Sequence, residues 1–230
     1  MELMNQNLPT KRKRIGVMCS GKGTNFENIV TSCNRHEVVL MIHDKEKCGA
    51  AKRAEKWGIP HVRIKHDRED EMIALFQSWR VDLIVLAGYM RILKRPSDFH
   101  CPIINVHPSL LPKYKGLNAV ERALDSNDTI TGCTVHYVNE ELDGGDIIAQ
   151  NKVDILPDDT VDTLTRRIQL QEYALLPYVI EHYETPVSKS ERKTLSAVGA
   201  RHAYRGEEYT SRGHRVEIDG GGWRRLDYGS

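Results

Sequence analysis

Short apolar runs of strand length alternate with segments of helical spacing along most of this 230-residue chain. Between the runs, apolar residues recur at spacings of three and four, as at Phe26, Ile29, Val30 and Cys33, which indicates helices with one buried face. The predicted strands are residues 15–19, 38–42, 59–64, 81–87, 103–107, 131–137 and 147–155, and the predicted helices are residues 26–33, 48–57, 68–79, 117–124 and 161–180. This alternation predicts an α/β fold with a mostly parallel central sheet flanked by helices.

Two stretches refine this picture. Residues 81–87 form the most continuous apolar run, which is typical of a central strand buried on both faces. The longest helical pattern follows Asp158, Asp159 and Thr160, and acidic residues there suit a helix N-terminus. Pro177 lies inside the pattern and is expected to kink or locally break the helix, because proline has no backbone N–H.

Composition divides the chain into three parts. Residues 1–13 are expected to form a polar, flexible leader, residues 14–184 carry the pattern of one α/β domain, and residues 185–230 are rich in Lys, Arg, Ser and Gly. The last part is expected to be a C-terminal appendage, as a hairpin around residues 216–218 or partly disordered. The basic cluster 11–14 is compatible with a nucleic-acid or localisation patch, but we interpret it as part of a solvated leader.

Charge and cysteine usage exclude several classes of protein. A net charge of +1, with 40% hydrophobic and 28% charged residues, is typical of a soluble protein and predicts no nucleic-acid partner. The start of the chain has no apolar segment long enough for a signal peptide or a membrane span, so we expect no membrane association. The five cysteines are odd in number and lack zinc-type spacing, so we expect free thiols in a reducing cytoplasm and no metal site.

The strongest candidate for chemistry lies at the end of the predicted strand 103–107. Asn105 and His107 are two residues apart, so their side chains project from the same face of that strand. The prolines that follow cannot donate to a sheet ladder, so the chain turns there across the edge where α/β proteins bind ligands. Asp143 is the candidate carboxylate that completes an acid–base and oxyanion-stabilising group. Taken singly, such a histidine is more often a packed core residue, and Asp143 is more often part of an Asp-Gly-Gly turn. The pairing of His107 with Asn105, the prolines that follow and the other segments favour the functional interpretation.

A glycine turn at residues 21–25 follows the first strand and opens the first helix. It fails the dinucleotide fingerprint at Phe26, where glycine is required, and the Walker loop at Gly23, where Ser or Thr is required. The free N–H groups and dipole of the helix N-terminus suit a single phosphate group. Capping of the helix by Thr24 or Asn25 explains the same residues equally well, so both interpretations stay open.

Four segments in one order resemble the phosphoribosylglycinamide formyltransferases. They are Ser20–Asn25, Val85–Leu93, Asn105–Pro112 and Leu142–Asp146. The resemblance spans residue 14 to about residue 183 and implies a Rossmann-like formyltransferase fold. It also implies an enzyme of de novo purine biosynthesis that transfers the formyl group of its co-substrate, 10-formyltetrahydrofolate, to the amine of glycinamide ribonucleotide. We expect a monomer or a homodimer.

The resemblance implies roles for individual positions. Asn105, His107 and Asp143 would be the catalytic residues. The ribonucleotide-binding residues would be Gly23, Thr24, Asn25, Gln169 and Glu172. The folate-binding residues would be Arg68, Met90, Arg91, Ile92, Leu93, Asn105, Asn139, Glu140, Glu141, Leu142 and Asp143. Lys22 departs from the family pattern, which has a small or amide residue at this position of the turn.

Formyl transfer passes through a tetrahedral intermediate with an oxyanion, so it needs hydrogen-bond donors and a proton acceptor. We expect the Asn105 amide and a protonated His107 to donate to the oxyanion. Asp143 is expected to raise the pKa of His107 and to help take the proton of the amine, directly or through water. A sugar N-formyltransferase or a formyltetrahydrofolate hydrolase is the nearest alternative. A non-catalytic phosphate- or nucleotide-binding module is a more distant one.

Overall fold

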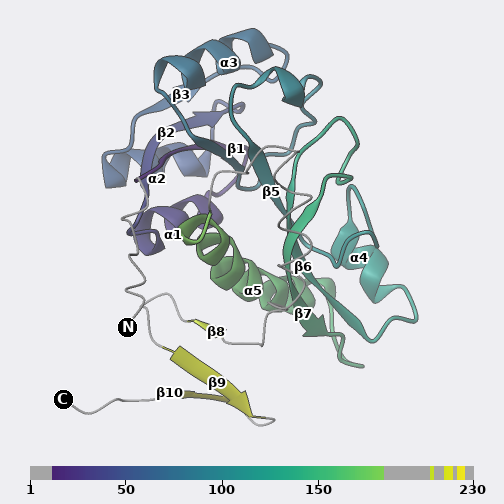
Figure 1. Cartoon of the computed structure of the whole chain (residues 1–230). Coiled ribbons are helices and arrows are strands. Elements are labelled where there is room, and N and C mark those ends of the chain that lie inside the picture. The colour runs from purple at the N-terminus through teal and green to yellow at the C-terminus, as the bar shows by residue number, and fades with distance from the viewer. Residues whose placement is uncertain (1–11, 184–207, 210–214, 220–221, 226–230) are drawn as a thin grey trace, which may run out of the picture.

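The computed structural model describes residues 12–183, 208–209, 215–219 and 222–225, and its main body is a seven-stranded sheet between helices (Figure 1). The strands are β1 (Arg14–Cys19), β2 (Glu37–His43), β3 (His61–Arg63), β4 (Leu83–Leu86), β5 (Ile103–His107), β6 (Ile130–Tyr137) and β7 (Ile147–Asp154). The helices are α1 (Thr24–Ser32), α2 (Gly49–Trp57), α3 (Glu69–Ser78), α4 (Ala119–Leu124) and α5 (Val161–Glu181), with a 3-10 turn η1 at Pro96–Asp98.

The strand order β3-β2-β1-β4-β5-β6-β7 confirms the predicted α/β class with a mostly parallel sheet. Strands β1 to β5 are parallel, whereas β6 runs antiparallel to β5 and β7 runs antiparallel to β6. The sheet grows from β1 towards β3 in one direction, and from β4 towards β7 in the other. The carboxyl ends of β1 and β4 therefore lie at a switch point, where open α/β sheets bind ligands.

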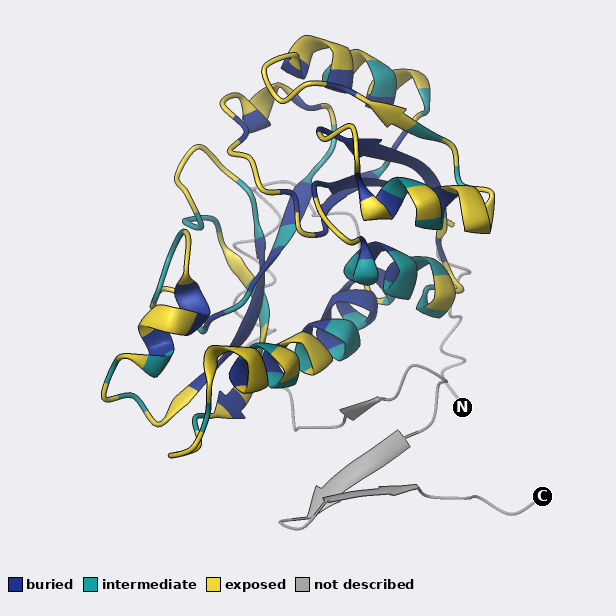
Figure 2. Cartoon of the chain, turned by 180° about the vertical axis from the view of Figure 1, so that it is seen from behind, coloured by how far each residue is buried: buried dark blue, intermediate teal, exposed yellow. Residues whose placement is uncertain are grey.

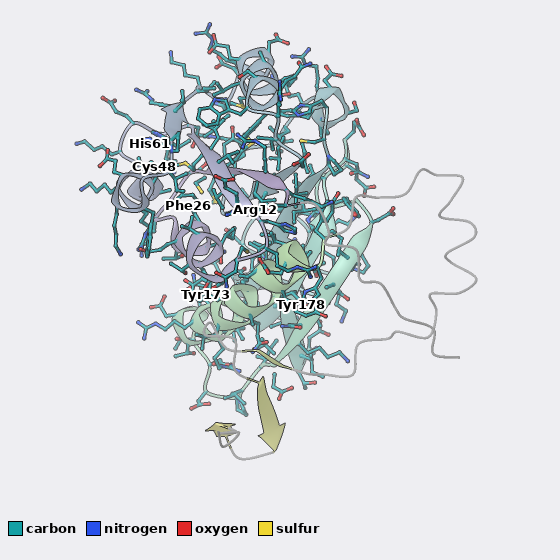
Figure 3. The ribbon with its side chains drawn as sticks, turned by 60° about the vertical axis from the view of Figure 1, so that its left-hand side comes forward. Arg12, Phe26, Cys48, His61, Tyr173 and Tyr178 are labelled. Carbon is teal, nitrogen blue, oxygen red and sulfur yellow. The ribbon has the colours of Figure 1, made fainter. Side chains whose placement is uncertain are left out.

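Each face of the sheet is covered by a separate apolar layer. Val85 of β4 belongs to the layer that α1, α2 and α5 complete, whereas its neighbour Ile84 belongs to the layer under α3. This two-sided burial explains why the central strand is continuously apolar. Figure 2 shows the central strands of the sheet in dark blue, because they are buried, and helices that are buried mainly on the side facing the sheet. Phe26 of α1 and Cys48, which precedes α2, are buried in the first layer and are labelled in Figure 3.

Helix α5 is the longest helix and packs against α1, β6 and β7 (Figure 1). A capping box begins it: the Thr160 hydroxyl accepts from the Thr163 N–H at 3.2 Å, and the Thr163 hydroxyl accepts from the Thr160 N–H at 2.9 Å. Pro177 lies within the helix, which continues to Glu181, so the predicted local break is wrong. The apolar face around Pro177 is buried, and this packing keeps the helix continuous across the missing N–H.

Three further strands, β8 (Glu208–Tyr209), β9 (Arg215–Asp219) and β10 (Gly222–Arg225), form an antiparallel sheet of order β10-β9-β8. Strands β9 and β10 pair where the sequence predicts a hairpin. Residues 1–11 and 184–207, which include most of the predicted leader and the start of the predicted appendage, lie outside the described residues. Among the helices that the structure describes, none has both the length and the apolarity that a membrane crossing requires.

Candidate active site

Four polar side chains meet at the carboxyl end of β5. Asn105 and His107 come from β5, His136 comes from β6, and Asp143 comes from the loop after β6. The antiparallel register places Asn105 opposite His136, and Asn105 Nδ2 lies 3.2 Å from His136 Nε2. Asp143 Oδ2 lies 3.3 Å from His107 Nδ1, and Asp143 Oδ1 lies 3.5 Å from His136 Nε2. The structure thus brings the three predicted catalytic residues together and adds a fourth; these four residues are the polar cluster.

Asp143 is held as a carboxylate although its side chain is only 8% exposed. Its Oδ2 accepts a hydrogen bond from the backbone N–H of Gly116 at 2.7 Å. Burial raises the pKa of Asp143, but the close imidazole of His136, the hydrogen bond from the Gly116 N–H and the imidazole of His107 together outweigh burial, so the pKa lies below its usual value. Asp143 is therefore ionised at neutral pH and able to accept a proton.

His107 lies between Asp143 and a backbone carbonyl. Its Nε2 is 2.9 Å from the carbonyl oxygen of Tyr114. Burial lowers the pKa of His107, and this effect exceeds the opposing effects of Asp143 and the Tyr114 carbonyl. The expected net rise in this pKa is therefore wrong. The carboxylate acts in the expected direction, but the loss of water around a side chain in a residue that is 5% exposed acts more strongly.

His136 is the member of the polar cluster that the sequence did not reveal. It is 1% exposed, and its Nδ1 donates to the Tyr137 carbonyl oxygen at 2.7 Å. Its Nε2 is then free to accept from the Asn105 amide, which orients that amide. A histidine among the β-forming residues of the strand 131–137 was the available signal. Its partners, however, come from the pairing of β5 with β6, which the sequence pattern does not specify.

Three of the predicted folate-binding residues carry exposed apolar side chains, and we call Met90, Ile92 and Leu142 the apolar rim. Met90 and Ile92, which follow β4, are 61% and 64% exposed, and Leu142, which precedes Asp143, is 49% exposed. Leu93 is buried in the layer under α3. Large apolar side chains at this exposure are a feature of ligand-binding surfaces when they occur together.

The loop after β4 is anchored to the ends of β1 and β2. The Ser20 hydroxyl accepts from the Met90 N–H at 2.9 Å, and Arg91 Nε donates to Asp44 Oδ2 at 2.7 Å. Burial raises the pKa of Asp44, but hydrogen bonds from Arg91 and Ser20 outweigh it and the pKa is lowered. These contacts fix the backbone of the apolar rim.

The remaining predicted folate-binding residues make local contacts at the surface. Arg68 pairs with Glu71 at the start of α3, and the structure does not join it to the polar cluster. Glu141 Oε1 lies 2.6 Å from Lys115 Nζ. The exposed residues of the loop after β6 include Asn139, Glu140 and Glu141.

The glycine turn faces α5 at the N-terminus of α1. Gly23 is the N-cap residue at φ +75°, and α1 has no side-chain cap, so capping by Thr24 or Asn25 is wrong. Asn25 Nδ2 instead donates to Glu172 Oε2 at 3.0 Å, and Asn25 Oδ1 is buried without a hydrogen-bond partner. Gln169 is exposed three residues before Glu172, so both project from one side of α5. The structure joins the turn to one of the two predicted α5 residues.

Glu172 makes the stability of the protein depend on pH. Burial raises its pKa from 4.5 to about 7, although the hydrogen bond from Asn25 opposes this shift. Between these two values the folded state binds the proton more tightly than the unfolded chain does. The free energy of unfolding therefore falls as pH rises through this window, by on the order of 3 kcal/mol in total.

Glu172→Gln is expected to remove this pH dependence, because the amide keeps an acceptor for Asn25 and carries no charge. Thermal unfolding of both proteins from pH 5 to pH 8 measures it. The melting temperature of the variant minus that of wild type should increase from pH 5 to pH 8. At pH 8 the variant should melt at a higher temperature than wild type. A constant difference across this range would contradict the assignment.

A buried carboxylate, imidazole and amide at the carboxyl edge of a doubly wound sheet define an α/β enzyme suited to acyl-group transfer through an oxyanion. More narrowly, the chain belongs to the formyl transferase family, whose profile matches residues 13–180.

Named relatives agree with this assignment. Over 184 residues the chain is 40% identical to the phosphoribosylglycinamide formyltransferase of Haemophilus influenzae. This alignment covers 74% of this chain and 87% of that protein. The crystal structure of phosphoribosylglycinamide formyltransferase from Bacillus halodurans matches with a TM-score of 0.71 at 37% identity, over 78% of this chain and 98% of that chain. Glycinamide ribonucleotide transformylase 1 from Symbiobacterium toebii matches with a TM-score of 0.71 at 32% identity, over 94% and 95% of the two chains. The resemblance inferred from four short segments is thereby confirmed.

Proposed function

We propose that this chain transfers the formyl group of 10-formyltetrahydrofolate to the primary amine of glycinamide ribonucleotide, a step of de novo purine biosynthesis. The observation that carries the proposal is the polar cluster at the end of β5, in a chain 40% identical to a phosphoribosylglycinamide formyltransferase. The proposal includes a cytoplasmic location, supported by the five unpaired cysteines, and a monomer or homodimer that needs no metal.

In the proposed mechanism, the amine nitrogen attacks the formyl carbon directly and a tetrahedral intermediate forms. The Asn105 amide donates to its oxyanion together with the His107 Nε2–H, which in the resting state donates to the Tyr114 carbonyl. Asp143 takes the proton that the amine loses, directly or through water, and the same proton is finally delivered to N10 as the C–N10 bond of the folate breaks. No covalent enzyme intermediate is required.

The lowered pKa of His107 modifies the expected mechanism. At neutral pH the resting imidazole is neutral and donates through one N–H. A negative charge developing beside it favours the protonated ring, and Asp143, 3.3 Å away, stabilises that form. His107 therefore gains its charge during the reaction rather than before it, by taking from Asp143 the proton that the amine has released.

We assign the remaining predicted residues to the two substrates. The apolar rim suits the flat ring system of the folate, and Arg68, Arg91, Leu93 and the loop at residues 139–143 complete this proposed pocket. The first turn of α1 at Gly23, Thr24 and Asn25 is proposed to bind the phosphate, with Gln169 and Glu172 on the rest of the ribonucleotide. The buried, unpartnered Asn25 Oδ1 is an acceptor, so it supports an O–H or N–H donor of the ribonucleotide there.

The test is a spectrophotometric assay for loss of 10-formyltetrahydrofolate, with glycinamide ribonucleotide present and absent. We expect loss only when the ribonucleotide is present. Loss without an acceptor would indicate a hydrolase. If no loss occurred with this acceptor, amino sugars would be tested next as acceptors. A negative result with those would favour the binding-module alternative.

Gly23→Ala is expected to raise the KM for the ribonucleotide about tenfold, the equivalent of about 1.4 kcal/mol of binding. A Cβ at Gly23 would lie 2.5 Å from Ala50 Cα, and φ is +75°, so the turn must move. Gly21→Ala is the matched control, because its Cβ would meet nothing within 4 Å. Steady-state kinetics that gave the same KM for both variants would argue against phosphate binding at this turn.

A further inference from the structure

The turn that follows β5 is held in shape by hydrogen bonds from Ser109 to backbone carbonyls on either side of it. We call residues 108–112 the proline turn. The Ser109 N–H donates to the His107 carbonyl at 2.9 Å, and the Ser109 hydroxyl donates to the Lys113 carbonyl at 2.6 Å. Ser109 is fully buried. The position of the proline turn therefore sets where the backbone beyond it, at Lys113 and Tyr114, passes the His107 ring.

Thr134 holds the proline turn to β6. It lies opposite His107 in the register and is fully buried. Its hydroxyl donates to the Ser109 carbonyl at 2.6 Å and accepts from the Leu111 N–H at 3.0 Å. One hydroxyl has a single proton and two lone pairs, so one acceptor position is left.

Gln150 of β7 fills that last position. Its Nε2 donates to the Thr134 hydroxyl and to the Leu111 carbonyl, both at 2.9 Å. The register places Gln150 directly opposite Thr134, so the two side chains lie on the same face of the sheet. With this amide in place, both the N–H and the C=O of Leu111 have partners and the Thr134 hydroxyl is saturated.

We propose that Gln150 is a positioning residue for formyl transfer. It acts through the proline turn on the Tyr114 carbonyl, which lies 2.9 Å from His107 Nε2 and so sets the direction of that ring. The inference rests on the role of His107 in the proposed function. Gln150 itself is exposed and lies on the edge strand, so its amide is not needed to fill the core.

The experiment compares wild type with Gln150→Met, which keeps the length of the side chain and removes the amide. Lys152→Met is the matched control, because Lys152 is exposed two residues further along the same face of β7. Gln150→Lys is a rescue variant that restores an N–H donor. The quantity measured is the single-turnover rate of formyl transfer with enzyme in excess, which does not depend on the fraction of inactive enzyme.

We expect Gln150→Met to react about fivefold to tenfold more slowly, with the KM for both substrates within about twofold of wild type. Lys152→Met should react at the wild-type rate, and Gln150→Lys should recover most of the loss. A wild-type rate in Gln150→Met would overturn the proposal, and so would a Gln150→Lys rate as low as that of Gln150→Met. His107→Ala is measured in parallel: an unchanged rate there would defeat the proposed function itself. If only His107→Ala is slow, this inference alone fails.

Discussion

Replacing Asp143 with asparagine is expected to lower kcat by at least about a hundredfold, the size of effect found when a group acting on an oxyanion or its proton is removed. The side chains have almost the same shape, so the loop after β6 can keep its position. The variant loses the ionised oxygen that faces His107 at 3.3 Å and the acceptor for the amine proton. The measurement is the ribonucleotide-dependent loss of 10-formyltetrahydrofolate, together with a melting curve.

Asp146→Asn is the matched control for Asp143→Asn. Asp146 belongs to the same loop and is exposed, and its backbone carbonyl, which accepts from the Tyr137 N–H, is unaffected by the change. We expect this control to keep kcat within about twofold of wild type, as is usual for surface substitutions. Near-normal turnover in Asp143→Asn would remove Asp143 from the proposed proton transfer.

The parallel part of the fold follows from short-range patterns. The apolar run at 81–87 predicts a central strand because burial on both faces leaves no polar alternation, and the structure places β4 there. The prolines after His107 likewise predict where β5 ends, because they cannot donate to the ladder. The direction of β6 and β7 has no such signal, since an apolar strand reads the same in either direction.

The details that the sequence did not predict depend on contacts between distant segments. His136 joins the polar cluster only because β6 runs antiparallel to β5 and places it opposite Asn105. The pKa of His107 is lowered because burial exceeds the effect of Asp143, and the degree of burial is a property of the folded chain. Pro177 does not break α5 because its surroundings are packed. Local rules predicted which segments carry the candidate catalytic residues, and tertiary packing determined the electrostatics of those residues.

Gly145→Ala is expected to lower kcat by about a hundredfold, because the loop that carries Asp143 passes directly over β6. A Cβ at Gly145 would lie 1.9 Å from the carbonyl oxygen of Tyr137 and 2.7 Å from its carbonyl carbon. Both atoms belong to the backbone, so no side-chain rotation relieves the overlap and the loop must move. A displacement of about 1 Å in a catalytic group can reduce turnover by this factor.

Gly144→Ala separates this effect from a general loss of glycine in the loop. The three atoms nearest to a Cβ at Gly144 all belong to the flexible side chain of Glu141, with Cδ at 2.3 Å, and that side chain can move away. We expect kcat within about threefold of wild type for Gly144→Ala, since the backbone that carries Asp143 stays in place. Kinetics and melting curves of the two variants provide the comparison. If Gly145→Ala had the same turnover as Gly144→Ala, the close contact between this loop and Tyr137 would be ruled out as the feature that holds Asp143 beside His107.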